Sequence, residues 1–213
     1  MATIFDTLVE RVETYAKKVS KWDSSPLRDI KNLSADAIGY VGERVLFNLC
    51  KNHGMDVEWD GNKNISKKGD NRPYDILLRG RKVEVKTARM GERGTFQHET
   101  LSNDNSPDFW IFIDISPHDT YITVIPSYDL TTKNPVLGRT AHSRKKTNDV
   151  YKLDTNEFVL KKGINSGITF KVPHGDDAHG FRSWLWSIVK PVSICQEVDE
   201  LSTPLDSTLS LSI

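Results

Sequence analysis

Residues 73–88 read PYDILLRGRKVEVKTA, and this stretch decides the fold that we expect. Residues 74–78 favour a strand, residues 79–81 contain a glycine and favour a tight turn, and residues 82–88 favour a second strand. Two strands joined by so short a turn pair as an antiparallel hairpin. The stretch therefore predicts a β-hairpin.

The second strand of this hairpin has an apolar face and a charged face. Side chains alternate along a strand, so Glu84 and Lys86 share one face while two valines share the other. Asp75, at the start of the first strand, lies within reach of Glu84 across the hairpin. Two carboxylates placed together on a sheet repel each other unless a cation or a proton relieves the repulsion. The alternative is an ordinary amphipathic hairpin whose polar face carries a ladder of Glu and Lys.

These residue types suit the hydrolysis of a phosphodiester bond. Mg²⁺ prefers carboxylate oxygens, with water filling its remaining positions, and a bound cation lowers the pKa of an attacking water. We expect Mn²⁺ to substitute for it. The Lys86 ammonium has three roles open to it: orienting the water, contacting the scissile phosphate, or transferring a proton if desolvation lowers its pKa.

A helix precedes the hairpin. Ser34 is its expected N-cap and Gly54 marks its expected end. Its apolar residues fall on one face at about 100° per residue: Ile38, Val41, Val45 and Leu49. Gly39 and Gly42 lower helix propensity, so we expect a packing reason for both. Glu43 lies beyond the edge of the apolar face and is a third candidate acid.

The rest of the chain completes an α/β fold with a central mixed β-sheet flanked by helices and additional C-terminal strands and helix. Apolar runs and alternation predict further strands: residues 55–59, 108–115, 121–125, 157–160 and 168–172. Amphipathic patterns predict helices over residues 5–19 and 180–189. Residues 90–105 are rich in glycine and polar residues and predict a mobile loop. We expect a single domain over residues 1–195, with residues 196–213 as a flexible tail.

Charge is segregated along the chain although the net charge is zero. Residues 63–93 and 139–146 are rich in Lys and Arg, so a neutral total is compatible with one basic face that binds phosphate. The alternative is that both clusters are solvated loops. The candidate DNA contacts are residues in or near these clusters: Arg89, Arg93, Gln97, His98, Arg139, Arg144 and Lys145.

The N-terminus and the cysteines limit the setting in which the protein acts. The first 22 residues are amphipathic but interrupted by charges, so they lack both a signal-peptide core and a spanning helix. We therefore expect a cytoplasmic protein with no membrane partner. Cys50 and Cys195 lie far apart in sequence and form no ligand pattern, so we expect reduced packing residues rather than a disulfide or a zinc site.

The pattern Pro73-x-Asp75 followed by Glu84-Val85-Lys86 resembles the PD-(D/E)XK nuclease superfamily, whose fold many restriction endonucleases and resolvases share. The helix with Glu43 is similar to the first core helix of that superfamily. The similar region spans about residues 35–125 and departs from the pattern at Tyr74, which separates the proline from the aspartate.

The resemblance implies a role for each residue of the candidate site. Asp75 and Glu84 would hold Mg²⁺ with the Val85 carbonyl, Lys86 would serve the water, and Glu43 would steady a second or transient ion. Attack in line would leave a 5′-phosphate and a 3′-hydroxyl on DNA.

Several functions share this chemistry. The first is a DNA endonuclease of the restriction type, which cuts both strands most simply as a homodimer. A junction resolvase, a transposition nuclease and a repair nuclease are alternatives with the same site. A non-catalytic DNA-binding module is the alternative from another class, although a retained carboxylate pair argues against it.

Overall fold

The structure is a computed structural model in which part of the chain is described. The described residues are Val9 and residues 20–59, 74–102, 107–127, 141–142, 150–175 and 177–191. Apart from Val9, the predicted helix over residues 5–19 lies outside them, as does the predicted tail over residues 196–213. Three candidate DNA contacts and one cysteine also lie outside: Arg139, Arg144, Lys145 and Cys195.

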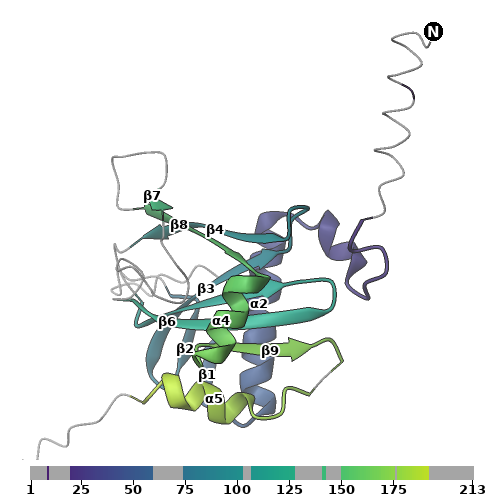
Figure 1. Cartoon of the computed structure of the whole chain (residues 1–213). Helices are drawn as coiled ribbons and strands as arrows, with labels where there is room; N and C mark the ends of the chain where they lie inside the picture. Colours follow the sequence, from purple (N-terminus) through teal and green to yellow (C-terminus); the bar gives the residue numbers. More distant parts are fainter. Residues whose placement is uncertain are drawn as a thin grey trace, which may run out of the picture.

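The described strands form two sheets (Figure 1). The six-stranded central sheet contains, in spatial order, β1 (Val57–Trp59), β2 (Ile76–Leu78), β3 (Arg81–Arg89), β5 (Phe109–Ile115), β6 (Asp119–Pro126) and β9 (Thr169–Pro173). The three-stranded second sheet contains β4 (Thr95–Ser102), β8 (Val150–Asn156) and β7 (Ala141–His142). Strands β3 and β5 are parallel and the other pairs are antiparallel, so the central sheet is mixed, as predicted.

Helices cover both faces of the central sheet. The described helical segments are η1 (Arg28–Asn32), α2 (Ala35–Asn52), α4 (Glu157–Asn165) and α5 (Phe181–Ile188). Helix α2 packs on β3 behind the sheet in Figure 1, whereas α4 lies in front, against β6, β8 and β9. The predicted mixed sheet flanked by helices, with additional C-terminal strands and helix, is confirmed. In the described part of the chain, no helix combines the length and apolar character needed to cross a membrane.

Helix α2 begins and ends where the sequence predicts. The Ser34 hydroxyl accepts a hydrogen bond from the Ala37 amide at 3.2 Å, and Gly54 follows the helix with a φ of 63°, a conformation that favours glycine. The buried face differs from the predicted one by a rotation about the helix axis. Its buried residues are Ile38, Gly42, Leu46 and Cys50. Cys50 is a buried free thiol, as expected, and burial raises its pKa to about 12.

The two glycines of α2 differ in their surroundings. A Cβ added at Gly42 would lie 1.8 Å from the Thr87 hydroxyl oxygen on β3, so only glycine allows the helix to approach the strand this closely. A Cβ added at Gly39 would meet nothing within 4 Å. The predicted packing reason is therefore correct for Gly42 and wrong for Gly39.

The described residues form two apolar cores. The larger core includes the valines of the hairpin, Val83 and Val85, and extends to Phe96 on β4 and Leu160 on α4. The smaller core lies between the two sheets: Leu101, Trp110, Phe112, Ile125 and Leu153. The second sheet is therefore packed against the central sheet by side chains of β4, β5, β6 and β8.

The prediction of a mobile loop over residues 90–105 was wrong for β4. Phe96 and His98 are buried while Gln97 and Glu99 are exposed, so this stretch has the alternation of a half-buried strand. Its burial depends on β8, a strand that the sequence did not reveal and that pairs with β4 antiparallel. A distant partner therefore overrides the local glycine and polar content.

The predicted strand over residues 157–160 was also wrong, because α4 occupies that position. The Asn156 side chain caps this helix by accepting a hydrogen bond from the Val159 amide at 3.0 Å. Leu160 and Gly163 are its buried residues, one turn apart. The capping asparagine was the sequence signal for a helix rather than a strand. The predicted strand before Pro173 and the predicted helix before Pro191 are confirmed as β9 and α5.

Candidate active site

The hairpin of β2 and β3 positions Asp75 beside Glu84. Ile76 pairs with Val83, and the Asp75 amide donates to the Val83 carbonyl at 3.0 Å, which carries the pairing one residue beyond β2. The Asp75 carboxylate accepts a hydrogen bond from the Val85 amide at 2.7 Å. The Asp75 carboxylate is therefore held against the backbone of β3 next to Glu84, as the sequence predicts.

Glu84 and Lys86 lie on the face of β3 that points away from α2. The Lys86 Nζ lies 2.7 Å from a Glu84 carboxylate oxygen, and the two side chains are 26% and 20% exposed. Both groups are thus partly desolvated yet open to a ligand. A pair with this exposure is a modest source of stability, because each charge gives up hydration to form it.

The electrostatics of Asp75 show that this site carries excess negative charge. The Asp75 pKa is raised from 3.8 to about 7, first by burial and second by the charge of Glu84. The Val85 amide lowers the Asp75 pKa, Glu43 raises it, and Lys86 lowers it. Favourable contacts therefore do not offset burial and the repulsion between carboxylates. A cation at this point would relieve the repulsion.

Glu43 approaches the site from α2 but does not join the other two acids as a ligand set. The Trp59 indole N–H donates to the Glu43 carboxylate at 3.0 Å, which fixes the side chain against β1. Glu43 is close enough to raise the Asp75 pKa. Within the described residues, no group of three or more His, Cys, Asp and Glu side chains is arranged to hold a metal. Asp75 and Glu84 are thus the acids that the hairpin brings together, and Glu43 lies near them on α2.

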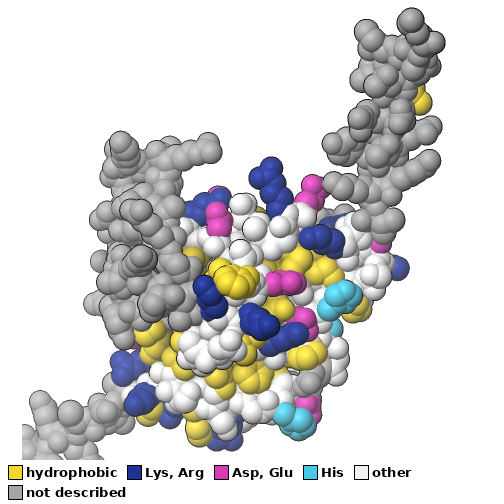
Figure 2. Space-filling model, viewed as in Figure 1, with side chains coloured by type: hydrophobic (Ala, Val, Ile, Leu, Met, Phe, Trp, Pro, Cys, Tyr) yellow, Lys and Arg dark blue, Asp and Glu magenta, His cyan; other side chains and the backbone are white. Residues whose placement is uncertain are grey.

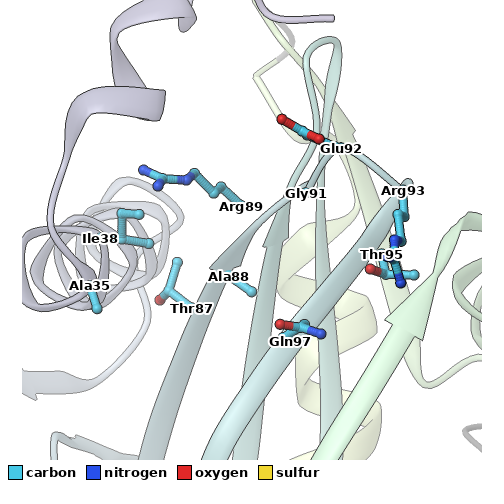
Figure 3. Close-up of a pocket in the computed structure, with 10 residues that line it drawn as sticks. All are labelled: Ala35, Ile38, Thr87, Ala88, Arg89, Gly91, Glu92, Arg93, Thr95 and Gln97. Carbon is cyan, nitrogen blue, oxygen red and sulfur yellow. The ribbon is translucent and has the colours of Figure 1, made fainter.

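A cleft of about 590 Å³ begins where this site ends along β3. Its walls are the end of β3, the turn into β4, β4 itself and the start of α2 (Figure 3). Arg93 and Gln97 line the cleft, together with Thr87 and Thr95. Two of the predicted DNA contacts therefore lie beside one another, on an open surface next to the candidate site.

Arg89 also lines the cleft, but its guanidinium has an internal role. It donates to the Ile30 carbonyl at 2.6 Å and to the Leu33 carbonyl at 2.9 Å. Ile30 is the middle residue of η1 and Leu33 directly follows η1, just before α2. Arg89 therefore anchors the entry to α2, and its role as a DNA contact stays a prediction.

The position of His98 corrects its prediction as a DNA contact. Its side chain is buried, and its Nε2 lies 2.8 Å from an Asp114 carboxylate oxygen. The Thr155 hydroxyl donates to the other Asp114 oxygen at 3.1 Å. This buried cluster of His98, Asp114 and Thr155 connects β4, β5 and β8, so His98 links the two sheets instead of reaching a nucleic acid. Alternation with the exposed Gln97 was the signal for this inward position.

Trp110 is a contact of the site that the sequence reasoning did not single out. Its ring centre lies 5.9 Å from the Lys86 Nζ. The strand was predicted correctly from its apolar run, but the parallel pairing that brings Trp110 beside Glu84 was not deduced. A run that is apolar on both faces gives no register.

Charges of both signs cover the face of the molecule shown in Figure 2. Lysine and arginine side chains alternate there with acids and apolar groups. The described part of this face carries α4 and α5. The cleft with Arg93 and Gln97 is the described surface that best fits the predicted basic face.

Comparisons with known proteins found remote structural likeness only. No family model matches the sequence, and no curated protein is similar to it. A bacterial homing endonuclease is 15% identical, with a TM-score of 0.37 over 62% of this chain and 96% of that chain. A restriction endonuclease in complex with substrate DNA is 17% identical, with a TM-score of 0.38 over 85% of this chain and 93% of that chain.

Proposed function

We propose that this chain is a magnesium-dependent DNA endonuclease of the restriction-endonuclease type, which hydrolyses phosphodiester bonds to 5′-phosphate and 3′-hydroxyl ends. The observation that carries the proposal is the pairing of Asp75 and Glu84 beside Lys86 on one strand face. The raised pKa of Asp75 supports it, because a protein gains no stability from burying two repelling carboxylates.

The donor set fits a hard divalent cation. Asp75 and Glu84 supply carboxylate oxygens, the Val85 carbonyl is the proposed third donor, and Glu43 is the proposed ligand for a second or transient ion. A bound Mg²⁺ supplies charge neutralisation at the phosphate and a more acidic water, and Mn²⁺ is expected to replace it. Both acids must be ionised for this role, so cation binding is expected to strengthen as pH rises through the pKa of Asp75.

Lys86 is the proposed group that orients the nucleophile. Its ammonium already donates to Glu84, so it is directed at the point where the two acids meet. From there it donates a hydrogen bond to the attacking water or to a non-bridging phosphate oxygen. The hydrogen bond from the Val85 amide keeps the Asp75 carboxylate in place during the reaction.

DNA is the proposed substrate, and the cleft beside the site is its proposed place of contact. Arg93 offers charge to a phosphate and Gln97 offers an amide to a base edge, on a strand whose other face is buried. Because one site cuts one strand, a homodimer is the proposed form for cutting a duplex. Light scattering on the purified protein, with and without DNA, tests this assembly.

Cleavage of supercoiled plasmid tests the proposed activity. Wild type is expected to nick and linearise the plasmid with Mg²⁺ and to be inactive with EDTA, and Glu84→Ala is expected to be inactive with either. Glu58→Ala, an exposed acid on β1, is the matched control and should cut like wild type. Cleavage that persists in EDTA, or in Glu84→Ala, contradicts the proposal.

A panel of substrates separates the restriction type from the alternatives with the same chemistry. Linear duplex, four-way junction, flap and single-stranded DNA are compared at equal concentration. Preference for linear duplex supports the restriction type, and preference for a branched substrate supports a resolvase or repair nuclease. Salt-sensitive binding with no turnover on any of them supports the non-catalytic module.

A further inference from the structure

Trp110 forms the floor under the charged pair of the site. It is the register partner of Glu84 across the parallel strands β3 and β5, so the two side chains stand side by side on the same face. Trp110 is only 3% exposed, although its neighbours Glu84 and Lys86 are open to solvent. The indole is thus the apolar surface on which the charged groups rest.

The Lys86 ammonium contacts both an anion and an aromatic ring. It is 2.7 Å from the Glu84 carboxylate and 5.9 Å from the centre of the Trp110 ring. An ammonium within about 6 Å of an indole face is attracted by the ring quadrupole, and the attraction grows as the site is desolvated. Two contacts at the end of one flexible side chain restrict where the ammonium can lie.

The Trp110 ring is itself fixed from behind. It stacks on Phe112 with ring centres 6.3 Å apart and an interplanar angle of 12°. Phe112 packs edge-on against His98 at 4.9 Å, and His98 belongs to the buried cluster with Asp114 and Thr155. A continuous set of packed rings therefore runs from the two-sheet junction to Lys86, and Trp110 has little freedom to move.

We infer that Trp110 is a positioning residue, which holds the Lys86 ammonium at the place where the proposed reaction needs it. The effect on catalysis rests on the proposed function, but the position of the Lys86 ammonium can be tested without metal or substrate. Glu84 by itself leaves Lys86 free to swing about the carboxylate. The contact with the Trp110 ring restricts this motion of Lys86. The ring itself is held in place by its packing on Phe112 and, through Phe112, on His98.

Acylation of Lys86 measures this positioning in metal-free protein. The protein is treated briefly with acetic anhydride and the modified fraction of Lys86 is read by mass spectrometry. We expect Trp110→Leu to raise the rate of Lys86 modification about threefold, and Trp110→Phe, which keeps a ring, to stay near wild type. Trp184, on α5, donates its indole N–H to the Gly167 carbonyl, and Trp184→Leu is the control that should leave the rate unchanged.

The stability of each variant decides how its result is interpreted. All variants are compared by circular dichroism and urea unfolding. Trp110→Met replaces Trp110→Leu if the latter does not fold, because the longer, unbranched methionine adapts to an irregular gap without supplying a ring. Equal Lys86 modification in wild type and in a folded variant without the ring overturns the inference. So does an equal rise in the Trp184→Leu control.

Kinetics give the second measurement. We expect Trp110→Leu to lower kcat about tenfold with a change in KM of less than about twofold, and Trp110→Phe to recover most of the loss. A wild type with no cleavage on any substrate contradicts the proposed function but leaves the acylation result standing. Normal kcat in a folded variant with freely reactive Lys86 would show that the positioning serves no catalysis, and would overturn the inference.

Discussion

The two faces of strand β3 differ in what they contribute to the molecule. On the α2 side, Val83 and Val85 are buried in the larger core and Thr87 meets the helix so closely that Gly42 has no room for a side chain. On the other side, Glu84 and Lys86 remain partly exposed and Asp75 is held with a raised pKa. Packing on the α2 side stabilises β3, and this stability offsets the destabilising effect of the charges on the other side.

The largest expected effect is a loss of cleavage, without a loss of stability, when the charged face of β3 is altered. Glu84→Gln keeps the size of the side chain and its contact with the apolar floor, but removes the negative charge. We expect cleavage to fall on the order of a thousandfold while the free energy of unfolding changes by less than about 1 kcal/mol. Initial rates on plasmid and urea unfolding are the two measurements. If the loss of cleavage is accompanied by a loss of stability large enough to explain it, the two faces do not have separate roles.

The next effect concerns the packed face. Gly42→Ala places a methyl group against Thr87, so we expect the free energy of unfolding to fall by about 3 kcal/mol. Gly39→Ala is the matched control three residues earlier on α2, where nothing lies within 4 Å. It is expected to raise stability by up to about 1 kcal/mol through helix propensity. If both variants change stability alike in urea, the close approach is not what fixes the strand.

A third prediction uses the pH dependence of Asp75. Because its pKa is raised from 3.8 to about 7, the folded protein binds the proton more tightly than the unfolded chain. Its contribution to stability is therefore fully present below pH 3.8, falls as pH rises to about 7, and stays reduced above that.

Asp75→Asn removes the contribution of Asp75 to the pH dependence of stability. In EDTA at pH 8 we expect it to be more stable than wild type by about 4 kcal/mol, and to match wild type near pH 4. Thermal unfolding at both pH values measures the difference. Adding Mg²⁺ at pH 8 should raise the Tm of wild type but not of the variant. A constant gap between the two proteins across pH would contradict the raised pKa.

The smallest expected effect concerns the cleft at the end of β3. In a Glu84→Gln background with Ca²⁺, Arg93→Ala is expected to weaken duplex binding about fivefold and to lower the salt dependence by about one released ion. Gln97→Ala is expected to alter preference among sequences with little change in salt dependence. Fluorescence anisotropy measures both, and Lys161→Ala, an exposed lysine on α4, is the control.

The sequence predicted the parts of the fold that are determined locally. Ser34 caps α2, the turn after Leu78 closes the hairpin, and the apolar run of β5 forms a central strand. Each of these depends on a few neighbouring residues, so pattern alone identifies them. The closeness of Asp75 and Glu84 follows from the hairpin, which is why that part of the site was predicted.

The parts that were missed depend on distant partners. Phe96 and His98 are buried only because β8 and β5 cover them, and Trp110 lies beside Glu84 only because β3 and β5 pair in parallel. Pairing between strands so far apart along the chain leaves no local signal in either strand. The structural role of Arg89 was missed for the same reason, because its carbonyl partners lie before α2.

The order of strands along the chain has a consequence for folding during synthesis. Strand β4 leaves the ribosome before β5 and β6, yet it pairs with β8, which comes after both. The β5–β6 hairpin forms from neighbouring residues. Phe96 and Leu101 of β4 become buried only after β8 has been synthesised. A nascent chain halted before residue 150 therefore presents an apolar, unpaired strand, and we expect it to require a chaperone or to aggregate.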